Sequence, residues 1–447
     1  MKYPHLDIVG NKPKNKVLKN LQAWKFFPWV VWGLGAFFYC YEYLLRTMPG
    51  LMKAPLTATY HLTDAQFGNL AAFYLYSYVP MQILVGVFMD RFLPRMLLSF
   101  AVMCCALGSI LFASTNILAV AQAGRLLVGF GSAFAFVGVL KLAAVWLPQN
   151  RFALVAGLTS SLGPLGALLG NNFLNFLVIE LGWKAVVFIS VGFGFTLTYL
   201  IWFVIRDGTG RGRGKLRQPE SSFGDLFNDL LVVLKKKQIW LNAVFACFGY
   251  MTLEVMADLW GTSYLHEGLG LSHNDAVFFN SLIYLGWLFG GPFFGWFSDY
   301  IKLRRLPMAI GAVCAATSFT VILFMPHSSR WVLTAMLLCV GFFSAAQALT
   351  FTFAKENAAP QVAGSVMAIT NLFTMIGGAV LQPLVGVMLD NEHLSAAQFG
   401  THVAQVDYRN ALVIVPIGMV LSLVAIAFMR ETHAKQQVQH NSKHKKN

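Results

Sequence analysis

The dominant pattern along this chain is a succession of long apolar stretches separated by short polar segments. A helix needs about 20 consecutive apolar residues to cross the hydrocarbon core of a bilayer. Twelve stretches reach that length, so the pattern predicts an all-α integral membrane protein with twelve transmembrane helices. The predicted spans are 26–50, 64–89, 96–115, 117–146, 153–178, 184–205, 239–264, 275–299, 306–325, 330–354, 361–389 and 409–429.

The spans form two sets of six, and only 206–237 and 390–408 are predicted as long connections. Sequence landmarks recur in the same order in both sets, with offsets of 211, 212 and 207 residues, which predicts a duplicated bundle. Parallel repeats are related by an axis along the membrane normal and place a substrate path between them near the midplane. The matched segments are Asp64-Ala-Gln-Phe-Gly-Asn69 with Asp275-Ala-Val-Phe-Phe-Asn280, Gly129-Phe-Gly-Ser-Ala133 with Gly341-Phe-Phe-Ser-Ala345, and Ala156-Gly157 with Ala363-Gly364.

This organisation gives five predicted regions: a basic tail at 1–25, a six-helix bundle at 26–206, a linker at 207–237, a second bundle at 238–430 and a tail at 431–447. Part of the linker, 222–237, allows two interpretations, an amphipathic helix on the membrane surface or a solvated connection. The helical interpretation rests on apolar residues that share one side, namely Phe223, Phe227, Leu230, Leu231 and Leu234.

Composition and charge support the membrane interpretation. The chain is 57% hydrophobic and 12% charged, against about 25% charged for a soluble protein. Its net charge of +14 does not indicate nucleic-acid binding, because the basic residues lie between spans and in the tails. All six cysteines lie within spans, which is typical of packing residues rather than disulfides or metal ligands. The lysine-rich N-terminus leads directly into a span and carries no signal-peptide pattern.

The basic residues also predict an orientation. If the N-terminus is cytoplasmic, 26 of the 33 lysines and arginines fall on the cytoplasmic side. Basic loops face the cytoplasm in multi-span proteins. We therefore expect a plasma-membrane protein, the bacterial inner membrane, with both termini in the cytoplasm.

Short motifs at the span ends resemble those of the major facilitator superfamily, and the resemblance covers essentially the whole chain. Gly86, Asp90, Arg91 and Arg95 look like the superfamily's signature between spans 2 and 3, and Gly295 with Asp299 repeats it in the second half. Leu93 departs from the usual glycine. Further similarities are Arg125-Leu-Leu-Val-Gly129-Phe-Gly131 in span 4 and Gly163-Pro164 in span 5, although the glycine doublet of the antiporter motif is absent.

The resemblance implies a transporter that works by alternating access, with spans 1, 4, 7 and 10 around the cavity. Tyr41-Glu42-Tyr43-Leu-Leu-Arg46 and Asp258-Leu-Trp260-Gly261 are similar to a bacterial branch that is distantly similar to the lysosomal dipeptide carrier. In the shared signature, Gly86 and Gly295 are expected to let helices approach closely. Asp90 and Asp299 are expected to hold a basic group in one conformation and release it in another.

Ionisable residues inside spans are the strongest site candidates, because each costs about 2.5–3.5 kcal/mol to insert. An offset of 212 pairs Glu42 with Glu254 and Arg46 with Asp258 across the repeat. Arg46 and Asp258 lie either in the site or at the outer water interface, and Lys141 is expected to extend toward the inner interface. The candidates are Glu42, Arg46, Arg125, Lys141, Glu254 and Asp258.

Each candidate receives an expected role. Arg125 cannot lose its charge, so we expect it to bind a substrate carboxylate, with Glu42 or Glu254 binding an amine. Glu254 and Asp258 lie four residues apart, so they are expected to face each other across one turn and share a proton, while Glu42 beside Arg46 stays charged. Polar side chains expected to line the path are Tyr39, Tyr43, Tyr250, Gln347 and Asn371.

These features predict a secondary active transporter that is driven by a proton gradient and takes a small polar solute such as a dipeptide, an amino-acid-like compound or an organic acid. A siderophore or other metal chelate, or drug efflux, is the alternative within the same fold. A non-transporting sensor or scaffold is the alternative class. No nucleotide-binding loop or catalytic constellation is recognisable, so we expect neither an enzyme nor a cofactor. The expected partners are the solute, the lipid bilayer and protons, with no nucleic acid, and the expected state is a monomer.

Overall fold

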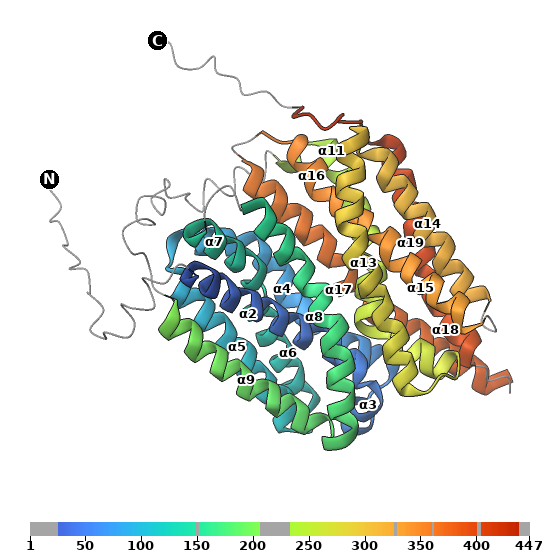
Figure 1. Ribbon diagram of the computed structural model, residues 1–447. Coiled ribbons are helices and arrows are strands. Elements are labelled where there is room, and N and C mark those ends of the chain that lie inside the picture. The colour runs from blue at the N-terminus through green and yellow to red at the C-terminus, as the bar shows by residue number, and fades with distance from the viewer. Residues whose placement is uncertain are drawn as a thin grey trace, which may run out of the picture.

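The computed structural model describes residues 26–147, 152–205, 233–325, 329–359, 362–399 and 404–437. These residues form two bundles of long helices that lie side by side (Figure 1). The first half contains α2 (Phe27–Leu51), α3 (Lys53–Tyr60), α4 (Asp64–Arg91), α5 (Pro94–Ser114), α6 (Leu118–Ser132), α7 (Ala135–Trp146), α8 (Phe152–Leu181) and α9 (Trp183–Val204). The second half contains α11 (Lys237–Met251), η2 (Thr252–Trp260), α12 (Gly261–Ser263), η3 (Tyr264–Gly268), α13 (His273–Ile301), α14 (Arg305–Phe324), α15 (Arg330–Ser344), η4 (Ala345–Ala348), α16 (Leu349–Glu356), α17 (Ala363–Phe399), α18 (Ala404–Leu412) and α19 (Ile414–Phe428).

The predicted spans are recovered as helices. Within the described residues, 11 helical stretches are long and apolar enough to cross a membrane. The remaining predicted span is α2, a helix of 25 residues. It carries Glu42, Arg46 and several tyrosines and tryptophans, which lower its mean hydropathy. The all-helical membrane fold predicted from the hydrophobic pattern is therefore confirmed.

The second long connection was predicted wrongly. Most of 390–408 is helical, because α17 continues for 37 residues to Phe399 and α18 begins at Ala404. The segment after Asp390 contains good helix formers and no proline or glycine before Gly400, so nothing in its sequence ends the helix where the apolar run ends. The predicted surface helix at 222–237 lies for the most part outside the described residues, as do the tails at 1–25 and 438–447.

Equivalent glycines hold equivalent helices together in the two halves. A Cβ atom on Gly129 of α6 would overlap the carbonyl oxygen of Tyr74 on α4. A Cβ atom on Gly341 of α15 would overlap the carbonyl oxygen of Ile283 on α13. Since α4 and α13 are the repeat-related partners, these contacts support the duplication that the sequence landmarks predicted.

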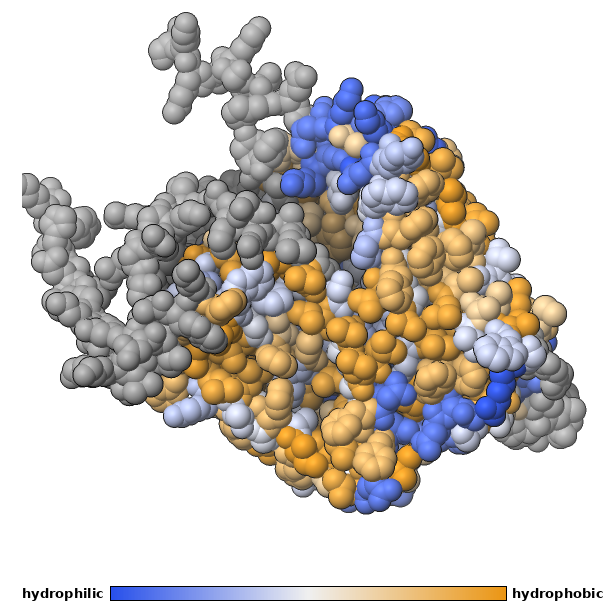
Figure 2. All heavy atoms as spheres, in the orientation of Figure 1, coloured by the Kyte–Doolittle hydropathy of each residue, from blue (hydrophilic) through white to orange (hydrophobic). Residues whose placement is uncertain are grey.

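The two halves meet where α4 packs along α17 and α8 packs along α13. We call the side on which α2 begins and α19 ends the basic side, because basic residues gather at the helix ends there, including Arg95, Lys302, Arg304, Arg305 and Lys355. The opposite side is called the far side. Apolar side chains cover the middle of the visible surface, and hydrophilic ones lie toward its two ends (Figure 2). That surface is hollowed between the halves on the basic side (Figure 2).

Candidate functional site

A buried ion pair joins the two halves. Arg46 on α2 lies 2.6 Å from Oδ2 of Asp258 and 3.7 Å from Oε1 of Glu254, both on η2. The side chains of Arg46, Asp258 and Glu254 are 6%, 2% and 0% exposed. Of the two locations that the sequence left open for Arg46 and Asp258, the structure therefore shows the buried one, with the two residues opposite each other as the repeat predicts.

The two acids lie on a π-helix rather than on the α-helix that was expected. η2 has hydrogen bonds between residues five apart, and both carboxylates on it face Arg46. Oε2 of Glu254 accepts a hydrogen bond from the backbone N–H of Gly378 at 2.6 Å. A Cβ atom at Gly378 would lie 2.7 Å from the carboxyl carbon of Glu254, so this approach requires glycine. Both acids thus share Arg46 as their cation, and Glu254 has the Gly378 N–H as a further partner.

Tyrosines surround this ion pair. The Tyr284 hydroxyl donates to Oδ1 of Asp258 at 2.7 Å. The hydroxyls of Tyr43 on α2 and Tyr250 on α11 lie 3.3 Å apart and connect the halves. The guanidinium carbon of Arg46 lies 5.3 Å from the centroid of the Tyr43 ring and 5.8 Å from that of the Tyr250 ring, within cation–π range. The Tyr39 ring packs against Tyr43, so these three tyrosines lie together beside Arg46.

Glu42 has a different environment. It is buried, and its Oε2 accepts a hydrogen bond of 2.7 Å from the Tyr74 hydroxyl. No basic side chain among the described residues forms an ion pair with it, because the ion pairs of Arg46 are directed to the acids of η2. A carboxylate buried without a counter-charge is strongly disfavoured, whereas a neutral carboxyl is tolerated. The contacts of Glu42 therefore differ from those of the η2 acids, because its carboxyl group is held by the Tyr74 hydroxyl and not by Arg46.

The Arg125 guanidinium, which was expected to bind a substrate carboxylate, here hydrogen-bonds to backbone carbonyls. Its Nη1 donates to the carbonyl oxygen of Leu45 at 2.7 Å, and its Nη2 donates to that of Ala71 at 3.3 Å. The Leu45 carbonyl lacks its usual helical partner because Pro49, four residues on, has no N–H. Arg125 thus joins α6 to α2 and α4 within the first half. Among the buried arginines of the described residues, Arg46 is the one that pairs with acids of the other half.

The other predicted polar residues separate into two groups. Asn371 on α17 donates from Nδ2 to Oε1 of Gln82 on α4 at 2.7 Å, and so connects the halves. Gln347 donates to Oγ1 of Thr374 at 3.0 Å, within the second half. Asn371 therefore forms a contact between the halves, as Tyr43 and Tyr250 do. Gln347 forms its contact within the second half.

Gly86 and Gly295 were predicted to let helices approach closely, and this prediction is wrong for the present conformation. A Cβ atom added at Gly86 or at Gly295 would meet no other atom within 4 Å. Both glycines lie near the basic side, and neither is needed for close helix packing here.

The charged signature residues differ in what they contact. Asp299 lies 2.6 Å from Nη1 of Arg304, whose Nη2 lies 2.7 Å from Glu356. The Asp299 carboxylate is 69% exposed, so its share of this network is weak. The Arg95 guanidinium lies 4.8 Å from the ring centroid of Trp202. Asp90 and Arg91 belong to α4, but their side chains lie outside the described part of the chain.

The profile of the Major Facilitator Superfamily matches residues 35–382, which is more than half of the chain. The chain belongs to this superfamily. It is therefore a multi-pass membrane transporter and not an enzyme. The superfamily motifs identified in the sequence lie within or near the matched region, at the ends of α4, in α6 and in α8.

Curated relatives in the superfamily are similar over most of their length. The chain is 24% identical over 330 residues to the probable sulfoacetate transporter SauU of Cupriavidus necator, covering 70% of this chain and 76% of that protein. It is 21% identical over 402 residues to the probable galactarate/D-glucarate transporter GarP of Escherichia coli, covering 82% and 86%. It is 24% identical over 388 residues to the hexose-6-phosphate:phosphate antiporter of Salmonella typhimurium, covering 79% and 81%.

Solved structures show the same fold. A bacterial homolog of the human lysosomal transporter Spinster, in an inward-facing and unoccupied conformation, superimposes with a TM-score of 0.73 and 16% identity, covering 92% of this chain and 98% of that one. The nucleoside transporter NupG superimposes with a TM-score of 0.68 and 14% identity, covering 90% and 98%.

The sequence did not reveal one group of charged residues in this superfamily member. Lys53, Asp64, Glu267, Asp390 and His393 gather on the far side. Lys53 begins α3, and His393 lies on α17. The partners are separated by up to several hundred residues, so no local spacing indicated the cluster.

Proposed function

We propose that this protein is a secondary active transporter that moves a small organic anion together with a proton by alternating access. The observation that carries the proposal is the Arg46–Asp258 ion pair, which crosses the boundary between the halves at 2.6 Å. Alternating access requires the halves to move against each other, so a charge pair across their boundary must rearrange during the cycle.

Arg46 is the residue proposed to bind the substrate. Its guanidinium keeps its charge in a buried site and presents donors that fit a carboxylate, sulfonate or phosphate group. The named substrates of the relatives above, namely sulfoacetate, galactarate or glucarate, and hexose 6-phosphate, all carry such a group. This shared chemistry favours an organic anion over the dipeptides that the sequence also allowed.

The charges around Arg46 support coupling to a proton. Asp258 and Glu254 together place two carboxylates against one guanidinium. A substrate anion that binds Arg46 must displace a carboxylate, which would then be buried beside a second negative charge. A proton bound by one of the carboxyl groups around Arg46 lowers that penalty, because it removes one negative charge from the site. Binding of the anion and uptake of a proton are therefore linked at this site.

Glu42 is proposed as the residue that carries the proton through the cycle. Its contact with Tyr74 and its lack of an ion pair among the described residues favour the neutral form in this conformation. It lies four residues from Arg46 on α2, so movement of α2 during the transition changes the surroundings of both groups. A proton released from Glu42 would leave a carboxylate that Arg46 can stabilise once the substrate has gone.

The orientation proposed here places the basic side in the cytoplasm, which agrees with the enrichment of basic loops on the inner face of membranes. The hollow between the halves on the basic side would then open inward (Figure 2). On this assignment, both termini are cytoplasmic and the protein lies in the plasma membrane, the inner membrane of a bacterium.

Uptake into proteoliposomes tests the proposal. Labelled sulfoacetate, D-glucarate, glucose 6-phosphate and a dipeptide are offered with and without an inward proton gradient. We expect one of the anions to accumulate in a way that depends on the gradient. We expect the Arg46→Gln variant to lose this accumulation. Arg330→Gln is the matched control, because Arg330 is 69% exposed and pairs with Asp275 at the surface.

Accumulation of the dipeptide alone would reject the anion assignment. Transport of the anions that is indifferent to the proton gradient would reject the coupling. No transport of these probes, but movement of a metal chelate or a drug, would favour the alternative substrates. Binding without movement of any probe would favour a sensor.

A further inference from the structure

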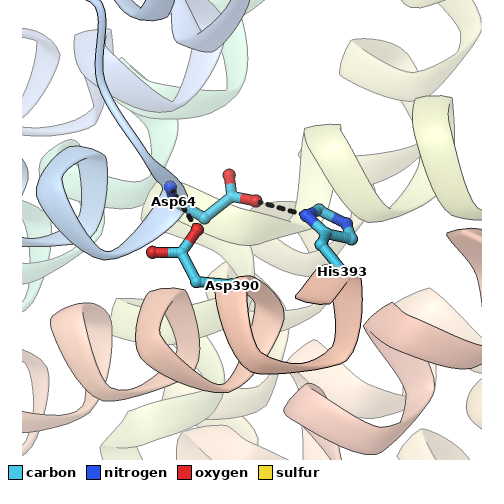
Figure 3. A group of neighbouring side chains, drawn as sticks. All are labelled: Asp64, Asp390 and His393. Atoms are coloured by element: carbon cyan, nitrogen blue, oxygen red, sulfur yellow. Dashed lines mark hydrogen bonds and ion pairs between the residues drawn. The ribbon is translucent and has the colours of Figure 1, made fainter. Parts of the chain in front are cut away.

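On the far side, charged residues of both halves form a single cluster. The first half contributes Lys53 on α3 and Asp64 at the start of α4. The second half contributes Glu267 on η3, Asp390 and His393 on α17, and Asp407 on α18. Figure 3 shows that Asp64 lies between Asp390 and His393, which approach it from one helix of the other half. We call these six residues the far-side cluster.

The contacts of the far-side cluster cross from one half to the other. Lys53 Nζ lies 2.9 Å from Asp64 in its own half and 3.0 Å from Glu267 in the other. The Asp390 carboxylate accepts hydrogen bonds from the backbone N–H groups of Asp64 and Ala65, at 2.9 and 3.0 Å. An acid of the second half therefore caps the N-terminus of α4 in the first half, where a negative charge is favourable. These contacts must break if the far side opens.

Asp64, Asp390 and His393 are residue types that hold divalent cations, and they offer one atom each within 4.8 Å of one another. Their present contacts argue against such a role. Both oxygens of Asp390 already accept backbone hydrogen bonds, and one oxygen of Asp64 is paired with the Lys53 ammonium. We therefore assign no metal to this cluster and consider its charges alone.

His393 lies between two acids on different elements. Its Nδ1 is 3.5 Å from Oδ2 of Asp64 and its Nε2 is 3.7 Å from Oδ2 of Asp407. Only the protonated imidazole can donate from both nitrogens. Among the described residues, the Lys53 ammonium pairs with Asp64 and Glu267 and also donates to the Tyr408 hydroxyl. A positive charge at His393 would lie against Asp64 and Asp407 and would tie α4 to α17 and α18.

We propose that the far-side cluster is a proton-sensitive gate, in which protonated His393 holds the far ends of the two halves together. Imidazole is the side chain that normally changes charge between about pH 5 and 8. Acid on the far side therefore favours the conformation seen here, with the far side closed, and neutral or basic pH favours its opening. The inference rests on the alternating access proposed above, but not on the identity of the substrate or on the coupling proton.

The test measures the distance between the two halves directly. Spin labels are attached to cysteines at Ala58 on α3 and Leu394 on α17, both exposed, in the full chain with its six native cysteines replaced. Distance distributions are recorded in liposomes at about pH 8 and pH 5.5, without substrate. The expected result is a ratio of closed to open molecules that rises about two- to fivefold at the lower pH, the size of a partly exposed ion pair.

Variants of His393 identify the residue responsible. His393→Gln should keep the more open distribution at both pH values, and His393→Lys should keep the more closed one. His266→Gln is the control, because His266 lies on the same side but contacts Leu271 of its own half. A pH dependence that survives in His393→Gln, or that is absent from the parent protein, would overturn the inference. Since no substrate is present, failure of the anion proposal leaves these outcomes unchanged.

Discussion

Replacement of Glu42 by glutamine tests the assignment of the transported proton most directly. Glutamine has nearly the shape of a neutral glutamic acid, and its amide oxygen can accept the 2.7 Å hydrogen bond from Tyr74. We expect Glu42→Gln to imitate the proton-loaded carrier permanently. The variant should exchange substrate across the membrane, because a loaded carrier still changes conformation. It should lose accumulation driven by a pH gradient, because no proton is released.

The structure also gives the expected cost in stability. If Glu42 is neutral, the substitution changes one neutral hydrogen bond, a difference of about 0.5–1.5 kcal/mol at most. Asp258→Asn provides the comparison, because it leaves Arg46 with only the more distant Glu254, 3.7 Å away. Breaking a buried ion pair costs about 3–5 kcal/mol. The melting temperature in detergent should therefore fall much less for Glu42→Gln than for Asp258→Asn.

The assay combines three measurements on proteoliposomes that contain equal amounts of each variant: gradient-driven accumulation, exchange of internal for external substrate, and the melting temperature of the purified protein. Glu254→Gln is the matched variant, since Glu254 is equally buried but lies against Arg46 and the Gly378 N–H. We expect it to weaken both accumulation and exchange. Undiminished accumulation by Glu42→Gln would refute the reasoning. Loss of accumulation only in Glu254→Gln would assign the transported proton to Glu254 on η2 instead.

Three other predictions concern Arg46, Arg125 and the orientation of the protein in the membrane. Arg46→Lys keeps the charge but loses the planar fork, so it should raise the substrate KM at least tenfold, whereas Arg330→Lys at the surface should leave uptake unchanged. Arg125→Ala leaves the Leu45 and Ala71 carbonyls without their donor, and should lower stability by about 2–4 kcal/mol in a melting assay while Arg125→Lys partly restores it. Single cysteines at Gly212 and Asn391 should react with a membrane-impermeant reagent from the inside and the outside respectively, and equal reaction from outside would reject the proposed orientation.

The hydrophobic pattern of the sequence was sufficient for the fold. Each span must satisfy its backbone hydrogen bonds internally, so an apolar stretch of sufficient length in a membrane forms a helix whatever its neighbours are. The matched landmarks in the two halves indicated the duplication for a similar reason, since Gly129 and Gly341 are local features that recur. The spacing of 212 residues between Arg46 and Asp258 even placed the two residues opposite each other.

Sequence alone could not decide which charges have partners. Arg125 and Arg46 are both arginines inside spans, but only the folded chain shows Arg125 against helix carbonyls and Arg46 against two acids of the other half. Pro49 was a local signal for the first arrangement, because it frees the Leu45 carbonyl. No local signal existed for the second, which depends on how two helices more than 200 residues apart are placed.

Tertiary structure also decided the conformational features. Glu254 and Asp258 lie on a π-helical element and face one guanidinium, and the Glu254 carboxylate also accepts a hydrogen bond from the Gly378 N–H of α17. The far-side cluster brings together Lys53 and His393, whose spacing along the chain carries no information. Local sequence fixes which segments enter the membrane, because the cost of burying polar backbone acts on each segment separately. Ion pairs between helices depend on the distance between side chains, and that distance exists only once the helices have packed.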